Sequence, residues 1–361
     1  MLNAECLVLK ALTEAAPQGI LATNACRWDG DAMRQSTVAA LIALVVLTLA
    51  CGGSSRTPTT PAPTTAARGA QYLNSILAIM EQNSVNRETI DWSAFRAQVL
   101  AAAPDPQTIP DTFPAIRVAL GLLNDHHSFY IKAGGKSSIL NPSSPTGCRI
   151  PDVPDPSVPT DIGYVRIPAF GEATGGEQLA AMIQDEVRRE DKNEIAGWIV
   201  DLRGNGGGNM YPMLAGVGPV LGAGTAGYFI SPSRTTPFGY DARGAFVGNV
   251  VQTSVASEYK LRRPNPRVAV LTDKQVASAG EAIVVAFRER PHTRSFGTET
   301  CGVPSGNALF MLSDTAQLYL TVSRDADRTR HVYDGPIVPD ETIGGSSAVV
   351  ARAIAWLRAG S

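Results

Sequence analysis

Histidine is scarce in this sequence, with four among 361 residues. They are His126, His127, His292 and His331. Because histidine is the usual general base near neutral pH, few residues are candidates for that role. The sequence also lacks His-Glu-x-x-His and paired-cysteine patterns, so the adjacent pair His126-His127 has no further ligands at the spacing of a common metal site. We therefore expect neither a metal nor a cofactor.

A large net charge is also missing. Lysine and arginine total 31 against 33 aspartates and glutamates, which leaves a net charge of −2. This balance gives no reason to expect nucleic acid or an anionic membrane surface as a partner. Hydrophobic residues make up 44% of the chain and charged residues 18%, as in a folded enzyme.

The apolar run near the N-terminus, residues 38–50, is shorter than the roughly 18 residues expected of a membrane-spanning helix. It follows Met33-Arg34 and ends at Cys51, as does the export signal of a bacterial lipoprotein. We expect 33–50 to be a lipoprotein-type signal peptide. Cys51 would then be the lipidated residue of an exported protein held at the cell envelope; a plain signal peptide and an uncleaved anchor are the alternatives.

The segments on either side of this signal differ from it in composition. Residues 1–32 carry mixed charges without a clear structural pattern, and we interpret them as a leader upstream of a true start at Met33. Residues 51–68 are rich in threonine, proline, serine and alanine, which is typical of a mobile tether.

The segment 272–281 has the features of a nucleophile turn. It follows the β-type run 267–271 and opens an amphipathic helix at 282–290. Ser278 has an alanine on each side and a glycine beyond, so a substrate carbonyl could approach it closely. The first N–H groups of a helix are unpaired and can stabilise an oxyanion. The alternative interpretation is that Ser278 only caps the helix.

A glycine-rich run follows the apolar strand predicted for 194–203. It reads Gly204-Asn205-Gly206-Gly207-Gly208-Asn209. Glycine tolerates positive φ and exposes its N–H groups, so the run can form a nest for an oxyanion. A phosphate-binding loop is disfavoured because no Gly-Lys-Ser/Thr follows, and a plain flexible turn is the other alternative.

These two segments, together with a third around the histidine pair, resemble the tail-specific, or C-terminal-processing, serine peptidases. The branch most similar is the one with the tricorn protease core and the retinoid-binding repeats. The resemblance covers about 71–343 and implies an α/β fold, with a crotonase/ClpP-like β-β-α core and a small N-terminal helical bundle. Its motifs are Ile90-Asp91-Trp92, Leu123-Asn124-Asp125-His126-His127-Ser128, Asp201-Leu202-Arg203-Gly204-Asn205-Gly206-Gly207, Ala277-Ser278-Ala279-Gly280-Glu281 and Gly335-Pro336-Ile337-Val338-Pro339-Asp340.

The resemblance also implies which residues react. In one branch the base is a lysine after the nucleophile helix, but Val303 stands at that position here and cannot accept a proton. In the other branch the base is the histidine of an Asp-x-His motif, which residues 125–127 match. Ser278 is therefore expected to be the nucleophile and His127 the base.

Three further roles follow from the same resemblance. Asp334 stands where the family has the glutamate that orients the base, although a turn residue is the alternative. His126 replaces a serine of the tricorn-type site, or else faces solvent. The oxyanion donors are expected to be the backbone N–H groups of Gly206, Gly207 and Ala279.

The rest of the chain divides by pattern. Apolar residues at helical spacing predict a helical N-terminal domain at 69–131. A Pro- and Ser-rich loop is expected at 132–160, the catalytic domain at 161–345 and a C-terminal helix at 346–361. The loop is too short for a PDZ module of about 80–100 residues. Strands are expected near 227–230 and 246–251, among others.

Cys148 and Cys301 could form a disulfide or remain buried thiols.

The function expected from these residues is that of an exported serine peptidase acting on a peptide or protein substrate. Two alternatives stay open. One is a non-catalytic binding protein on the same scaffold, favoured by the departures at Asp334 and His126. The other is an esterase that uses the same serine and histidine.

Overall fold

The computed structural model describes residues 65–149 and 153–360. The expected leader and signal peptide, Cys51 and most of the tether lie outside these described residues. Within the described part, no helix has the length and apolarity needed to cross a bilayer.

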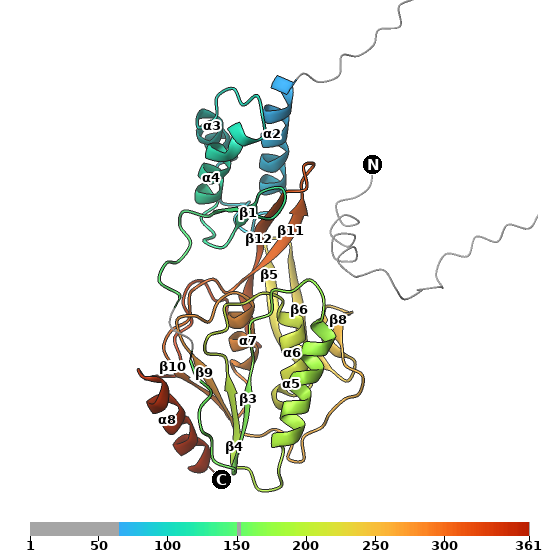
Figure 1. Ribbon diagram of the computed structural model, residues 1–361, viewed down its shortest axis with the longest axis vertical. Helices are drawn as coiled ribbons and strands as arrows, with labels where there is room; N and C mark the ends of the chain where they lie inside the picture. The colour runs from blue at the N-terminus through green and yellow to red at the C-terminus, as the bar shows by residue number, and fades with distance from the viewer. Residues whose placement is uncertain (1–64, 150–152, 361) are drawn as a thin grey trace, which may run out of the picture. The chain divides into compact units, whose positions relative to one another are not determined.

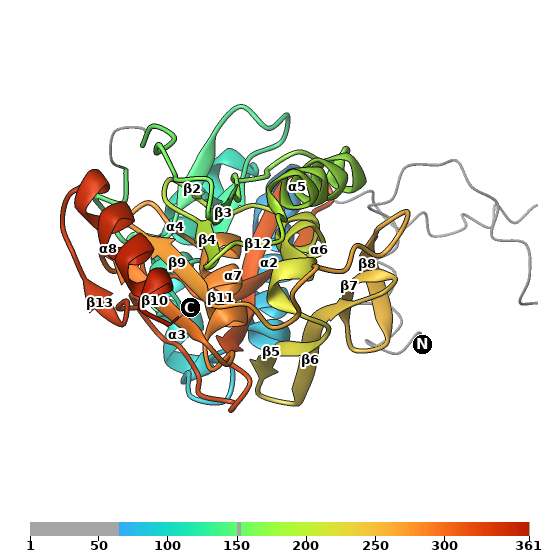
Figure 2. The ribbon, with the colours of Figure 1, turned by 90° about the horizontal axis from the view of Figure 1, so that it is seen from below.

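A five-stranded parallel sheet forms the centre of the C-terminal half, in the order β13-β10-β9-β4-β3. Its strands are β3 (Ile162–Arg166), β4 (Gly197–Asp201), β9 (Val268–Thr272), β10 (Thr293–Gly297) and β13 (Glu341–Thr342). Helices cover both faces, with α8 on one side and α5 and α6 on the other (Figures 1 and 2). They are α5 (Gly176–Glu190), α6 (Met210–Leu221), α7 (Ala279–Phe287) and α8 (Ser346–Arg358).

Burial on both faces explains why the central strands are apolar without interruption. In β4, Trp198 and Val200 pack into the core that includes α5, α6 and α7, whereas Ile199 packs against α8. Successive strand residues point to opposite faces, so a covered parallel sheet needs an apolar residue at every position.

An antiparallel sheet of eight strands lies beside this layer, in the order β2-β1-β12-β5-β6-β7-β8, with β11 paired to β12. Its strands are β1 (Phe129–Ile131), β2 (Ser138–Leu140), β5 (Gly224–Ser231), β6 (Arg234–Asp241), β7 (Gly244–Val247), β8 (Val250–Ser254), β11 (Ser305–Met311) and β12 (Gln317–Ala326). β12 is the longest of them. It pairs with β1 near its start, with β5 near its end and with β11 along its other edge.

The N-terminal helices are α2 (Thr65–Asn83), α3 (Trp92–Ala101) and α4 (Phe113–Leu122), with the short 3₁₀ helix η1 (Pro110–Thr112) before α4. Asp91 caps α3 by accepting from the N–H groups of Ser93 and Ala94. Their core also includes Tyr130 of β1 and Leu318 of β12, so the antiparallel sheet continues into this region. In Figure 1 the outer ends of β11 and β12 reach toward these helices.

The architecture confirms the expected α/β fold with N-terminal helices, but one expected strand was wrong. Residues 246–251 are not one strand, because a turn at Gly248 with φ of +57° separates β7 from β8. The sequence also gave no signal for β6, which contains Pro237 and Gly239. Both residues are unfavourable inside strands, and only the pairing with β5 and β7 overrides that preference.

Candidate active site

Ser278 lies at the junction between β9 and α7, where it is the N-cap residue of the helix. Its backbone has φ of +52° and ψ of −118°, a conformation that non-glycine residues rarely adopt. A serine on such a sharp strand-to-helix turn can be presented outward, as in the nucleophile turn of α/β-hydrolases. The cap and the nucleophile interpretations of Ser278 are therefore compatible.

Glu281 stabilises this unusual turn from within the protein. Its fully buried carboxylate accepts the N–H of Ser278 at 2.8 Å. The same carboxylate accepts the N–H groups of Gly302 at 2.8 Å and Val303 at 2.9 Å, and the hydroxyl of Thr300. Burial raises the pKa of Glu281, and these hydrogen bonds oppose that rise. One acid thus connects the serine turn to the segment 300–303.

The glycine run begins where β4 ends, at a buried ion pair. Arg203 donates to both carboxylate oxygens of Asp201, at 2.8 and 2.6 Å. The next residue, Gly204, donates its N–H to the Asp273 carboxylate at 3.1 Å. The Asp-Leu-Arg-Gly motif therefore fixes the start of the run against the end of β9.

The glycine run packs directly on the serine turn. The N–H of Ala277 donates to the carbonyl of Asn205 at 3.0 Å. Gly207 has φ of +98°, and a Cβ at this position would lie 2.7 Å from the Ala277 carbonyl oxygen and 2.9 Å from Cβ of Ser278. Only glycine fits here without strain. The structure thus brings together the glycine run and the serine turn, which were identified from separate motifs in the sequence.

The three N–H groups expected to bind an oxyanion differ in whether they already donate a hydrogen bond. The N–H of Gly207 donates to the side-chain oxygen of Asn205 at 2.9 Å, so it is already engaged. The N–H groups of Gly206 and Ala279 have no hydrogen-bond acceptor among the described residues. Gly206 is exposed, and Ala279 is the first residue of α7. Two unpaired donors therefore flank the serine turn.

His127 lies in the turn before β1, with both its backbone and its ring held. The Asp125 carboxylate accepts the N–H of His127 at 3.1 Å, and Asn307 donates to the His127 carbonyl at 3.1 Å. Nδ1 of the half-buried ring lies 2.8 Å from Oγ of Ser305, the first residue of β11. Desolvation lowers the pKa of His127 to about 4, so the ring is neutral at pH 7.

The other two predicted residues, His126 and Asp334, have partners other than the ring of His127. Nδ1 of His126 bonds the carbonyl of Ser143 at 3.1 Å, and its backbone has φ of +62°. The Asp334 side chain is 73% exposed and forms an ion pair of 3.4 Å with Arg324. Among the described residues, neither His126 nor Asp334 bonds the ring of His127. The ring's partner, Ser305, was missed, because no local motif marks it.

Two further features support the site at a distance. Cys148 and Cys301 form a disulfide, which joins the loop before β3 to the segment that binds Glu281.

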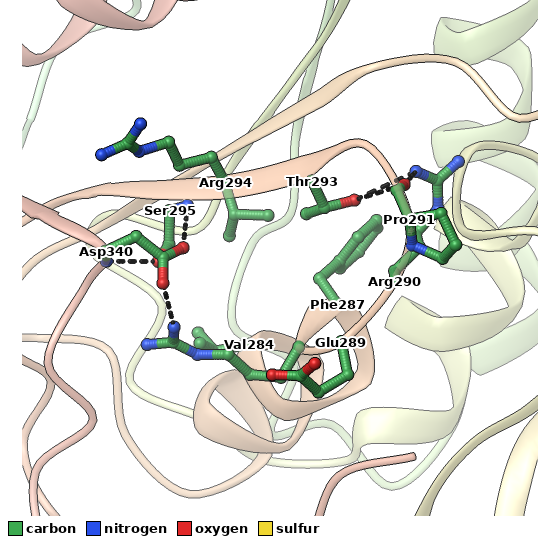
Figure 3. Close-up of a pocket in the computed structure, with 11 residues that line it drawn as sticks. Val284, Phe287, Glu289, Arg290, Pro291, Thr293, Arg294, Ser295 and Asp340 are labelled. Atoms are coloured by element: carbon green, nitrogen blue, oxygen red, sulfur yellow. Dashed lines mark hydrogen bonds and ion pairs between the residues drawn. The ribbon is translucent and has the colours of Figure 1, made fainter. Parts of the chain in front are cut away.

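At the other end of α7, a pocket of about 420 Å³ contains Asp340, whose carboxylate faces Ser295 (Figure 3). Asp340 accepts the N–H of Ser295 at 2.7 Å and pairs with Arg288 at 2.8 Å. The Pro-Asp motif therefore anchors α7 to β10 and does not line the serine turn.

The fold and the serine turn define the class of serine peptidases with a crotonase/ClpP-like core. The chain belongs to peptidase family S41, whose family profile matches residues 161–343. This match confirms the family that the sequence motifs indicated.

Individual relatives agree with this assignment. A nisin-resistance protein of Lactococcus lactis is 24% identical over 295 residues, covering 80% of this chain and 86% of that protein. A lipoprotein structure from Streptococcus agalactiae superposes with a TM-score of 0.60 at 20% identity, covering 83% of this chain and 98% of that one. The photosystem II D1 C-terminal processing protease has a TM-score of 0.51 at 16% identity, covering 78% and 96%. At these identities the two structures support the fold alone.

Proposed function

We propose that this protein is a serine peptidase that hydrolyses peptide bonds through an acyl-enzyme on Ser278. His127 takes the Ser278 proton on Nε2 as Oγ attacks the substrate carbonyl, and a tetrahedral oxyanion forms. The resulting imidazolium then protonates the leaving amine. A water molecule attacks the acyl-enzyme in the same way, His127 accepts its proton, and Ser278 is released with a free hydroxyl.

The observation that carries this proposal is the packing of Gly207 on Ser278 at a turn with positive φ. Strained backbone of this kind concentrates at functional sites because it must be held by its surroundings. The unpaired N–H groups of Gly206 and Ala279 supply donors for the oxyanion, and each such donor is worth about 2.7–4 kcal/mol in comparable sites. The neutral state of His127 at pH 7 is the state that a general base requires.

Covalent labelling tests the nucleophile directly. A fluorophosphonate probe is expected to modify Ser278, located by peptide mass spectrometry, and Ser278→Ala should lose both labelling and peptide hydrolysis. Ser231→Ala, in the hairpin between β5 and β6, is the matched control and should retain both. Peptide hydrolysis that survives in Ser278→Ala would refute the nucleophile.

The histidine pair offers a second matched comparison. His127→Ala should reduce turnover far more than His126→Ala, because only His127 is proposed to move the proton. Equal losses would mean that the base has been assigned to the wrong residue. A binding protein on this scaffold would show no labelling of Ser278 at all, and an esterase would turn over ester substrates but not the matching peptides.

We also propose that the protein is exported and lipid-anchored through Cys51. The disulfide between Cys148 and Cys301 supports an oxidising compartment, because such bonds persist outside the cytosol. Metabolic labelling with a fatty acid should mark the wild-type protein in the membrane fraction, whereas Cys51→Ala should lose the label. A labelled Cys51→Ala protein would refute the anchor.

A further inference from the structure

We propose that Ser305 is the positioning residue of the base, and that its hydroxyl holds His127 as the tautomer with the proton on Nδ1. This inference rests on the proposed function for its catalytic meaning. It assigns to a hydroxyl the place that a carboxylate occupies in a Ser-His-Asp triad.

The contact itself is short and its two ends are fixed. Oγ of Ser305 lies 2.8 Å from Nδ1 of His127. On the ring's side, Asp125 and Asn307 hold the backbone N–H and carbonyl of His127. On the other side, Ser305 pairs with Arg324 of β12, and its N–H donates to the Val303 carbonyl at 2.8 Å. Neither partner needs to move for the bond to form.

The same hydrogen bonds continue to the nucleophile. The N–H of Val303 donates to Oε2 of Glu281, the oxygen that also accepts the N–H of Ser278. A path therefore runs from Ser278 through Glu281, Val303 and Ser305 to the ring of His127. Each step is 2.9 Å or shorter between donor and acceptor. One series of hydrogen bonds thus holds both the turn at Ser278 and the partner of the base.

The direction of the ring bond follows from the proton count. A neutral imidazole has one N–H and one acceptor nitrogen, and the nitrogen that accepts the serine proton must be unprotonated. With Ser305 accepting from Nδ1–H, Nε2 is left as the acceptor. A hydroxyl can also accept from Nδ1–H of the imidazolium, so the same bond persists after proton transfer.

A hydroxyl affects the base differently from a carboxylate. It carries no charge, so it offsets less of the desolvation that lowers the pKa of His127 to about 4 than a carboxylate would. The ring consequently remains neutral over a wide pH range, and its orientation comes from hydrogen-bond geometry instead of from an ion pair. Asp334, which the sequence motif aligns with the family glutamate, is paired with Arg324.

Three variants test the assignment by kinetics. Ser305→Ala should lower kcat/KM about 10- to 100-fold, mainly through kcat, as is usual when the partner of a functional histidine is removed. Ser305→Thr retains the hydroxyl and should therefore keep most of the wild-type kcat/KM. Ser323→Ala, on the neighbouring strand β12 opposite Gly306, is the matched control and should behave as wild type. Equal kinetics for Ser305→Ala and Ser323→Ala would overturn the proposal.

The pH profile separates positioning from a loss of packing. Loss of the hydroxyl removes an acceptor that favours the imidazolium, so the acid limb of kcat/KM should move to lower pH in Ser305→Ala. Loss of packing around the His127 ring would instead hydrate the ring and move the acid limb to higher pH, toward the ordinary histidine pKa near 6.5. An upward shift would therefore overturn the positioning role and indicate a structural one.

Nitrogen-15 NMR of labelled histidine tests the tautomer independently of any activity. The His127 signals, assigned by their loss in His127→Gln, should show a protonated Nδ1 and an unprotonated Nε2 near pH 7. Ser305→Ala should shift this population toward the other tautomer. A wild-type ring protonated on Nε2 would overturn the inference even in an active enzyme. The predicted tautomer in a protein that never labels at Ser278 would support the contact and reject the peptidase.

Discussion

Asp325 leads to a stability prediction that depends on pH. The residue lies in β12 with 1% of its surface exposed, and neither carboxylate oxygen has a hydrogen-bond partner among the described residues. Its backbone is fixed, because its N–H donates to Pro304 and its carbonyl accepts from Tyr333. Desolvation, followed by the negative charge of Glu281, raises the pKa of Asp325 from its ordinary value of 3.8 to about 8.

The sign and size of the effect follow from proton linkage. Below about pH 3 the carboxyl is protonated in both states and its ionisation has no influence on the free energy of unfolding. As the pH rises toward 8, the unfolded chain releases this proton while the folded chain keeps it, so the folded state loses stability. The slope is about 1.4 kcal/mol per pH unit, which gives roughly 4 kcal/mol between about pH 5 and pH 8. Above the folded pKa the loss levels off.

Asp325→Asn isolates this ionisation, because asparagine has nearly the same shape and cannot ionise. In urea titrations with the disulfide kept intact, the variant should be about 2 kcal/mol more stable than wild type near pH 5 and about 4 kcal/mol more than that near pH 8. Asp241→Asn is the control. Asp241 is paired with Arg243 near the surface and its pKa is lowered, so its ionisation adds no slope in that interval. A stability difference for Asp325→Asn that stays constant with pH would refute the reasoning.

Three other predictions concern the serine turn and its base. Gly207→Ala should reduce fluorophosphonate labelling of Ser278 by at least tenfold, because its Cβ would fall 2.9 Å from that of Ser278; unchanged labelling would contradict the packing. Glu281→Gln should lower the free energy of unfolding by about 2–6 kcal/mol, measured in urea, since an amide cannot accept from all four donors; a loss below 1 kcal/mol would contradict this anchor. Because burial lowers the pKa of His127 to about 4, the acid limb of kcat/KM should lie well below pH 6.5, and a limb at 6.5 would mean a hydrated ring.

Much of the parallel layer could be predicted from sequence because its signals are local. The C-terminal helix predicted from residue 346 is observed as α8, which begins at Ser346 and ends at Arg358. The strands β4 and β9 are runs of apolar residues, each followed by turn residues. Ser278 and Gly207 were both selected from residue type and position, and the structure brings them into contact.

The parts that could not be predicted depend on contacts between distant residues. Ser305 follows a proline and precedes a glycine, a context that suggests only a turn, and its partner lies 178 residues away. β6 has weak strand propensity and exists because its neighbours pair with it. Asp334 was selected by alignment with a motif, but a motif does not determine which way a side chain points, and Arg324 is the partner observed.

The two buried acids Glu281 and Asp325 differ in the number of hydrogen-bond donors that contact them. Glu281 meets four donors, which oppose the rise that burial causes in its pKa. Asp325 meets none within 65–149 and 153–360 and keeps its proton at neutral pH. Two ionised carboxylates near one another in this buried region would repel, and the negative charge of Glu281 is one cause of the raised pKa of Asp325. Stability lost at Asp325 thus accompanies a turn at Ser278 whose positive φ costs about 1–3 kcal/mol and is held by the hydrogen bond to Glu281.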